Sequence, residues 1–267
     1  MLKTRVITGT ILGVLVLLAV FGISDKAFMF ATAVFTLLGA WEWSKLAGIE
    51  TMLSRAVYLV AMLVLMWVAW YLPLLFIAFI ACLWWLLALY FIVNYPNKQT
   101  VWSSINMRIL MGLLVLIPFW LSINAIRSHP HGPLLLMFCF IMVWAADIGA
   151  YFAGRRFGKT KLMPKVSPGK SWEGFIGGLL LSMIVASIVS AVVDIHFSGW
   201  FLLMLFVILL NIYSVVGDLL ESMLKRYCNV KDSGTILPGH GGILDRIDSL
   251  TAATPLFLLG LFLYLHF

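Results

Sequence analysis

Carboxylates at helical spacing are the first candidates for chemistry in this sequence of 267 residues, of which only 11% are charged. Asp218, Glu221 and Lys225 stand at positions i, i+3 and i+7 and would share one face of a helix. Asp245 and Asp248, in the segment LDRIDS, repeat the i, i+3 spacing. Carboxylates from two helix ends can meet on one cation, and oxygen ligands without a thiolate or histidine cluster favour Mg²⁺ or Mn²⁺ over Zn²⁺. We therefore predict a metal site formed by Asp218, Asp245 and Asp248.

Simpler roles compete for the same acidic residues. Asp218, Glu221 and Lys225 would also suit a solvated ion-pair stripe at a helix end. Asp245 and Asp248 would also stabilise the first turn of a helix through its dipole. The glycine before Asp218 favours the functional interpretation, because a residue without a side chain lets a ligand or another backbone come close.

The segment PGHGG, residues 238–242, lies between the two groups of carboxylates. Glycine-rich backbone can present N–H groups to phosphate oxygens, which makes Gly241 and Gly242 candidates for a phosphate site. An ordinary turn is the alternative. One histidine is weak evidence for zinc, so His240 is expected to hydrogen-bond to substrate or backbone.

A second polar segment, GRRFGKTKLMPKVSPGKSWEG, spans residues 154–174 and contains Glu173 as its one acid. Lys165, Ser167 and Lys170 would bind phosphate as charges and hydrogen-bond donors, and attraction to anionic lipid headgroups is the alternative. The letters PGKS resemble the end of a P-loop, but Pro164 stands where that motif requires glycine, which excludes a P-loop ATPase.

Two further acids lie in or beside apolar runs. Asp147 should lie about two turns from the end of its helix, and an acid inside a membrane span is a functional candidate by default. A buried, paired structural aspartate is the alternative. Glu42 lies near the end of another apolar run and is interpreted as an interfacial polar residue.

The elements that position these residues are predicted to be membrane helices. The chain is 63% hydrophobic with a mean hydropathy of +1.06, and it contains many apolar runs long enough to cross a bilayer. We predict an all-α, polytopic membrane protein with about nine transmembrane helices. Their expected ranges are 6–21, 28–46, 57–72, 74–93, 109–126, 134–153, 175–193, 200–220 and 250–267.

Basic residues are distributed unevenly between the two sides of this arrangement. Of the 18 Lys and Arg residues, Lys26 and Arg127 fall on one side and the remaining sixteen on the other. The positive-inside rule then places the N-terminus in the cytoplasm and the C-terminus outside, with the polar loops 154–174 and 221–249 in the cytoplasm. The same rule accounts for the net charge of +7 without nucleic-acid binding. We divide the chain into N-terminal helices (1–130) and a C-terminal catalytic region (131–267).

The segment SMLKRYCNVKDSGTILPGHGGILDRID, residues 222–248, resembles the signature of the phosphatidate cytidylyltransferases, also called CDP-diacylglycerol synthases. The family pattern is S-x-φ-K-R-x4-K-D-x-small-x2-φ-P-x-H-G-G-φ-x-D-R-φ-D, where φ is apolar, and the segment matches it throughout. KVSPGKSWEGFIGG and the acid of VWAADIGAYFAG also resemble bacterial members of the family. The resemblance extends to chain length and to the many-helix layout.

The resemblance implies that CTP and phosphatidate react to give CDP-diacylglycerol and diphosphate, in phospholipid biosynthesis at a bacterial inner membrane. It implies dependence on a divalent metal, Mg²⁺ or Mn²⁺, which position assigns to Asp218, Asp245 and Asp248, and it leaves open an additional monovalent cation and a homodimer. Phosphate contacts would come from Lys225, Arg226, Lys231 and Arg246, with Asp232 and Glu221 orienting them. The triphosphate site would be shaped by His240, Gly241 and Gly242, and Lys165, Ser167, Lys170, Glu173 and Asp147 would help to bind substrate.

Two other functions are compatible with parts of this pattern. A CTP-dependent lipid kinase would phosphorylate a lipid alcohol and release CDP, and it would need a base for the hydroxyl group. An ion-coupled transporter would use Asp147 and Asp218 as intramembrane sites, but it would not need a set of phosphate-binding residues. A structural scaffold does not account for the clustered carboxylates.

Overall fold

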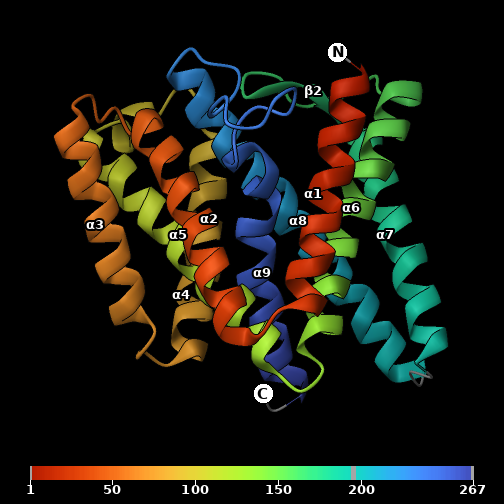
Figure 1. The fold of residues 1–267 in the computed structure, drawn as a ribbon. Helices are drawn as coiled ribbons and strands as arrows, with labels where there is room; N and C mark the ends of the chain where they lie inside the picture. Colours follow the sequence, from red (N-terminus) through yellow and green to blue (C-terminus); the bar gives the residue numbers. More distant parts are fainter. Residues whose placement is uncertain (1, 194–196, 266–267) are drawn as a thin grey trace.

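The computed structural model describes residues 2–193 and 197–265, and most of that part is helical (Figure 1). A short 3₁₀ helix, Gln99–Val101, precedes α5. The α-helices in the described residues are α1 Leu2–Gly22, α2 Asp25–Leu46, α3 Met52–Ala69, α4 Leu74–Val93, α5 Ile105–Ser128, α6 Gly132–Phe157, α7 Trp172–Val192, α8 Phe197–Tyr227 and α9 Leu244–Leu265.

Within the described residues, seven helices, α3 to α9, are long and apolar enough to cross a membrane. The described part of α1 offers a shorter apolar stretch, Ile7–Gly22. The chain is thus a multi-pass α-helical membrane protein, as its composition predicts, and the nine predicted helices are present. Seven of them meet the length and hydropathy of a span, where nine spans were predicted.

The ends of α8 and α9 differ from the predicted ranges. α8 continues through Tyr227 and α9 begins at Leu244, so the loop between them is 228–243 instead of 221–249. Met223 and Leu224 are buried and extend the apolar face of α8, while Glu221 and Lys225 pair along the helix. Residues that appear polar in the sequence can therefore continue the helix. The last two residues of the predicted ninth helix, 266–267, lie outside the described residues.

The segment predicted as the loop 154–174 contains a β-hairpin, which an all-α prediction misses. β1 (Lys161–Met163) pairs antiparallel with β2 (Ser167–Ser171), with Lys161 opposite Ser171. The strands are short and mostly polar, so they lack the alternation of apolar and polar residues that would have predicted them.

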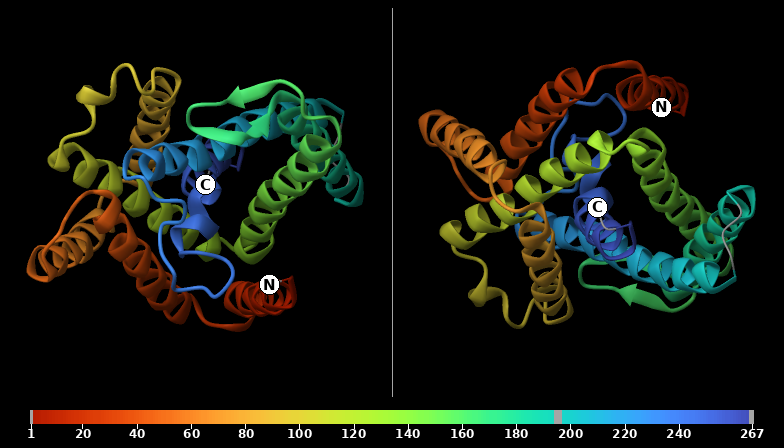
Figure 2. Two further views of the ribbon diagram at one scale, coloured as in Figure 1. Left: turned by 90° about the horizontal axis from the view of Figure 1, so that it is seen from above. Right: turned by 90° about the horizontal axis from the view of Figure 1, so that it is seen from below.

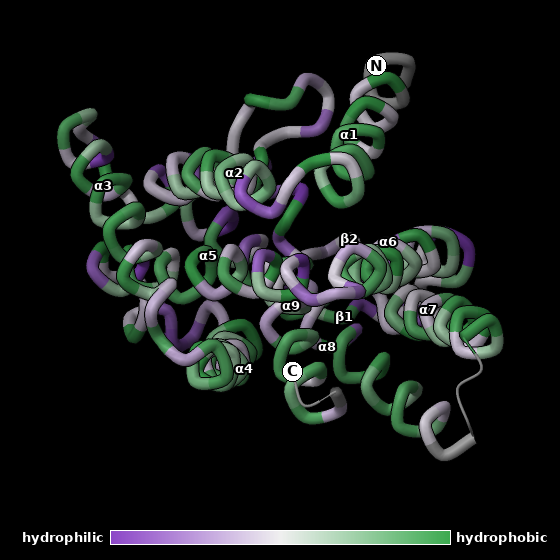
Figure 3. Tube along the Cα trace, turned by 60° about the horizontal axis from the view of Figure 1, so that its bottom comes forward, coloured by the Kyte–Doolittle hydropathy of each residue, from purple (hydrophilic) through white to green (hydrophobic). Residues whose placement is uncertain are grey.

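The polar connections gather at one end of the helices. Figure 1 shows the N-terminus, the hairpin and loop 228–243 at its top, and the end of α9 at the bottom. Colouring by hydropathy shows mainly hydrophobic helices with hydrophilic segments in the connections (Figure 3). This arrangement agrees with the predicted grouping of the two polar segments on one side of the membrane.

Helix α9 occupies the centre of the fold. It packs against α8, α4, α5 and α6, and more lightly against α2, as both end-on views show (Figure 2). The peripheral helices α3 and α7 expose large apolar side chains such as Val60, Trp67 and Ile188, as expected for surfaces in contact with lipid. The proposed division at residue 130 stays a prediction. In the structure, α4 and α5 from the first part pack against α9 from the second.

Candidate active site

The site forms where α8 and α9 cross in close backbone contact. A Cβ atom at Gly217 would meet the backbone carbonyl oxygen of Asp248 closer than real Cβ atoms approach, so the crossing requires glycine at this position. The sequence suggested that Gly217 admits a ligand or a backbone, and here it admits a backbone. The contact brings the polar face of α8 beside the first turns of α9.

Lys225 joins the two helices at the centre of a buried ionic cluster. Its Nζ atom lies 2.6 Å from Oδ1 of Asp245 and 3.1 Å from Oε1 of Glu221. The side chains of Lys225 and Glu221 are only 11% and 4% exposed. Buried charges are tolerated when they are paired and hydrogen-bonded, and Lys225 serves two carboxylates at once.

The second oxygen of Asp245 closes loop 228–243 onto the start of α9. Oδ2 accepts hydrogen bonds from the backbone N–H of Ser233 (3.0 Å), the hydroxyl of Ser233 (2.9 Å) and the backbone N–H of Gly242 (2.8 Å). Gly241 has a φ of +82° and lies against the same carboxylate, where a side chain would collide with it. Both oxygens of Asp245 therefore accept hydrogen bonds from protein groups, and the N–H of Gly242 is used by Asp245.

The hairpin contributes a second cation to the site. Nζ of Lys170 on β2 lies 2.7 Å from Oδ2 of Asp218, and the hydroxyl of Ser222 donates to the other oxygen of Asp218 at 3.1 Å. Nε of Arg226 donates to the backbone carbonyl of Val166 in the hairpin turn at 3.3 Å. The structure thus brings the two polar segments of the sequence together over the end of α8.

Asp248 and Asp147 complete a group with more acidic than basic side chains. Asp248 accepts a hydrogen bond from the backbone N–H of Ser249 at 2.7 Å and interacts electrostatically with Asp218, Lys225 and Lys170. Asp147, on an exposed face of α6, interacts electrostatically with Asp218, Lys170 and Arg246. Five carboxylates (Asp147, Asp218, Glu221, Asp245 and Asp248) thus share three cations (Lys170, Lys225 and Arg246).

Other predicted residues lie around this group. Both carboxylate oxygens of Glu173 accept a hydrogen bond from the backbone N–H of Thr160, at 3.1 and 3.2 Å, so Glu173 holds the base of the hairpin. His240 lies beside Gly9 of α1, and its Nδ1 is buried without a hydrogen-bond partner among the described residues. Exposed or half-buried positions at the polar end are taken by Lys165, Ser167, Arg226, Lys231, Asp232 and Arg246.

Glu42 is the main residue of this region that the sequence did not assign to the site. It is only 1% exposed, so the interpretation as an interfacial residue was wrong. Its Oε2 accepts hydrogen bonds from the backbone N–H of Leu244 (2.9 Å) and the hydroxyl of Ser233 (3.2 Å). No local spacing connects α2 to residues so distant in sequence. The only signal is an acidic residue inside an apolar run, which is costly unless it has partners.

The acidic side chains of the site fit a divalent cation in part. In residues 2–193 and 197–265, no three His, Cys, Asp or Glu side chains are close enough together to form a preformed metal site. Asp218 and Asp248 nevertheless fit the chemistry, because they are hard oxygen donors in a cluster with more acidic than basic side chains. Asp218 and Asp245 already have donors on both carboxylate oxygens, so the assignment of the three aspartates to metal stays a prediction.

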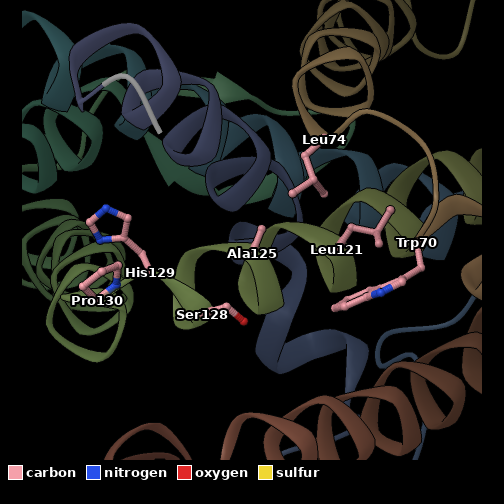
Figure 4. A pocket seen from close by; sticks show the side chains of 7 residues that line it. All are labelled: Trp70, Leu74, Leu121, Ala125, Ser128, His129 and Pro130. Carbon is pink, nitrogen blue, oxygen red and sulfur yellow. The ribbon is translucent and has the colours of Figure 1, made fainter.

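One cavity among the described residues lies beside the site, and another lies at the opposite end of the fold. A small space of about 10 Å³ lies beside Glu221 and Asp248, which is close to the volume that one water molecule needs. A larger cavity of about 490 Å³ lies at the far end of α5 and is mainly apolar, and Figure 4 shows its lining of Trp70, Leu74, Leu121, Ala125, Ser128, His129 and Pro130. That lining has no carboxylate or lysine for phosphate chemistry.

Comparison of the sequence with known proteins finds several bacterial phosphatidate cytidylyltransferases. A phosphatidate cytidylyltransferase of Pseudomonas aeruginosa is 43% identical over 259 residues, covering 96% of each chain. One from Haemophilus influenzae is 40% identical over 96% of this chain and 97% of its own. One from Bacillus subtilis is 44% identical over about half of each chain (49%). Residues 3–264 match the family described as the cytidylyltransferase family, and the chain belongs to it.

Proposed function

We propose that the protein transfers the cytidylyl group of CTP to phosphatidate and releases diphosphate, giving CDP-diacylglycerol for phospholipid biosynthesis. Membership of the cytidylyltransferase family and near-full-length similarity to phosphatidate cytidylyltransferases support this activity. The observation that carries it in the structure is the folding of residues 222–248 around Lys225, whose ammonium group joins carboxylates of α8 and α9.

In the proposed reaction, a phosphate oxygen of phosphatidate attacks the α-phosphorus of CTP, and the bond to the β-phosphate oxygen breaks. The lipid phosphate is ionised near neutral pH, so the reaction does not require a strong general base. The work of the protein is to position two anionic substrates and to offset their charge.

The exposed cations are the groups that we assign to the phosphates. Lys170, Arg226 and Arg246 lie around Asp218 and at the polar ends of α8 and α9, with Lys231 in the adjoining loop. Lys225 is buried and already pairs with Glu221 and Asp245, so we assign it to holding these carboxylates in place. Lys165 and Ser167 in the hairpin are proposed to help enclose CTP.

We propose that Asp218 and Asp248 hold Mg²⁺ or Mn²⁺, with Asp245 orienting the helix that carries Asp248. When bound, the metal would neutralise charge on the triphosphate and the leaving diphosphate. Asp218 would hold the metal in place of its present partner Lys170, whose ammonium group would then be available to bind a phosphate. An additional monovalent cation at this site stays a prediction.

We further propose that the site faces the cytoplasm of a bacterial inner membrane. The support is the excess of basic residues on the side that carries the hairpin and loop 228–243. The apolar outer surfaces of α3 and α7 give the enzyme direct access to membrane lipid. A homodimer remains a prediction from the family resemblance.

Labelled CTP tests the reaction directly. The purified protein is incubated in detergent–phosphatidate micelles with Mg²⁺ and with CTP labelled in the cytidine ring. Cytidylyl transfer moves the label into the lipid fraction. A CTP-dependent lipid kinase would instead leave all of the label in water-soluble CDP, and that result would reject the proposed function.

A further inference from the structure

We infer that Glu42 of α2 is a positioning residue for the proposed cytidylyl transfer, acting through Ser233 and the start of α9. The inference rests on the proposed function. Glu42 lies far outside the signature segment 222–248, yet its carboxylate accepts hydrogen bonds from two residues of that segment, Ser233 and Leu244.

The surroundings of Glu42 are unusual for a carboxylate. It is almost fully buried, and its described hydrogen bonds come from a backbone N–H and a hydroxyl group instead of a cation. Its Oε1 has no hydrogen-bond partner among the described residues. Burial of a carboxylate under these conditions is unfavourable, so the side chain does not serve stability alone.

The carboxylate of Glu42 connects loop 228–243, through Ser233, to the first residue of α9. Leu244 is the first residue of α9, and its N–H has no partner within that helix. Cβ atoms at Gly234 and Gly242 would occupy the space of the Glu42 carboxylate, so these glycines allow the loop to close around it. Glu42 therefore holds the loop and the first turn of α9 against α2.

Ser233 connects Glu42 to the ionic cluster. Its hydroxyl oxygen lies 3.2 Å from Oε2 of Glu42 and 2.9 Å from Oδ2 of Asp245. A hydroxyl group has one hydrogen and serves one of these acceptors at a time. A substitution at Glu42 should therefore alter the position of Asp245 and of its partner Lys225. It should also shift the start of α9, the helix that carries Asp248.

The test compares Glu42→Gln, Glu42→Ala and Ser233→Ala with wild type in steady-state assays over ranges of CTP, phosphatidate and Mg²⁺. We expect Glu42→Ala to raise the KM for CTP and the Mg²⁺ concentration for half-maximal activity about tenfold, in line with outer-shell changes at metal sites. Glu42→Gln keeps the shape and one acceptor oxygen and should restore part of the loss. The KM for phosphatidate should stay near its wild-type value.

These constants separate positioning from folding. A purely structural role would reduce the active fraction, and therefore the maximal rate, while leaving the KM for CTP and the Mg²⁺ requirement unchanged, and that result would overturn the inference. If Glu42→Ala does not fold, Ser233→Ala must shift the same constants, and its effect must not add to that of Glu42→Gln. Glu50→Gln, an exposed acid just beyond α2, is the matched control and should behave as wild type. If the wild-type protein shows no cytidylyl transfer, the proposed function is rejected, and this result is distinct from a failure of the inference about Glu42.

Discussion

Lys225 is the residue on which the buried charges of the site most depend. Its ammonium group neutralises Glu221 from its own helix and Asp245 from the next one. Removing one member of a buried ionic group leaves an uncompensated charge, which typically costs about 3–5 kcal/mol. The strength of the cluster is therefore best measured by removing its cation.

Lys225→Met should lower the free energy of unfolding by about 3–5 kcal/mol and abolish cytidylyl transfer, because Glu221 and Asp245 lose their shared partner. Thermal unfolding in detergent and the labelled-CTP assay measure the two effects. Lys26→Met, which removes an exposed lysine, should change stability by less than about 0.5 kcal/mol. Equal unfolding temperatures for the two variants would contradict this role of Lys225.

Asp218→Asn tests the proposed metal site at the same scale. The amide keeps a group beside Ser222 and Lys170 but loses the negative charge, so Mn²⁺ binding without substrate should weaken by at least about tenfold. Titration calorimetry or manganese resonance measures this binding. Asp25→Asn removes an exposed carboxylate that pairs with Arg127, far from the site, and should bind metal as wild type does. Unchanged affinity in Asp218→Asn would rule out Asp218 as a ligand.

Local spacing predicts one part of the candidate site and is silent about the rest. Asp218, Glu221 and Lys225 share a face of α8, and Asp245 and Asp248 share a turn of α9, as their spacing indicates. Glu42 and Ser233 have no such spacing, because their contact depends on how α2 packs beside loop 228–243. Glu173 was expected to help bind substrate, and the structure shows its carboxylate accepting a hydrogen bond from the backbone N–H of Thr160 at the base of the hairpin.

Among the elements, the crossing of α8 and α9 controls the geometry of the site. The contact between Gly217 and the carbonyl of Asp248 fixes how closely the two helices approach. Ala252 also lies against this point, so neither helix can move aside without disturbing the packing on the other.

Gly217→Ala should push α8 away from α9 and reduce cytidylyl transfer by more than tenfold, since a displacement of about 1 Å in a positioned site can cost about 100-fold. The assay compares this variant with Gly13→Ala, a helical glycine of α1 with nothing within 4 Å of the added Cβ. Gly13→Ala should be active and slightly more stable, by up to about 1 kcal/mol. Full activity in Gly217→Ala would show that the crossing tolerates a side chain.

Helices were predictable from hydropathy, whereas their polar ends were not. The apolar runs located all of the described α-helices, because a helix that crosses the membrane core needs about 20 mainly apolar residues. The extension of α8 through Tyr227 depends on the Glu221–Lys225 pair, and the hairpin depends on contacts such as Arg226 with Val166. Neither interaction has a signature in hydropathy.

At the scale of the whole molecule, the two ends of the helices differ in kind. One end carries the hairpin, loop 228–243 and the N-terminus, and the other carries the connections α1–α2, α3–α4 and α5–α6 (Figure 1). The proposed orientation assigns the first end to the cytoplasm.

Single cysteines test this orientation in intact cells with a membrane-impermeant maleimide. His131→Cys, at an exposed position before α6, should be labelled from outside. Lys159→Cys, exposed beside the hairpin, should be labelled only after the membrane is opened. The two variants serve as controls for each other, and the reverse pattern would invert the proposed topology.

The central place of α9 has a consequence for how the protein is made. The ribosome delivers α9 after α2, α4, α5, α6 and α8, which are the helices that surround it in the finished fold. Until then Asp245 is absent, and Glu221 and Lys225 enter the membrane as a neighbouring pair that neutralises itself. Within α8, Glu221 therefore has a partner before α9 arrives, and catalytic competence arises only when the arriving helix docks among the helices that surround it.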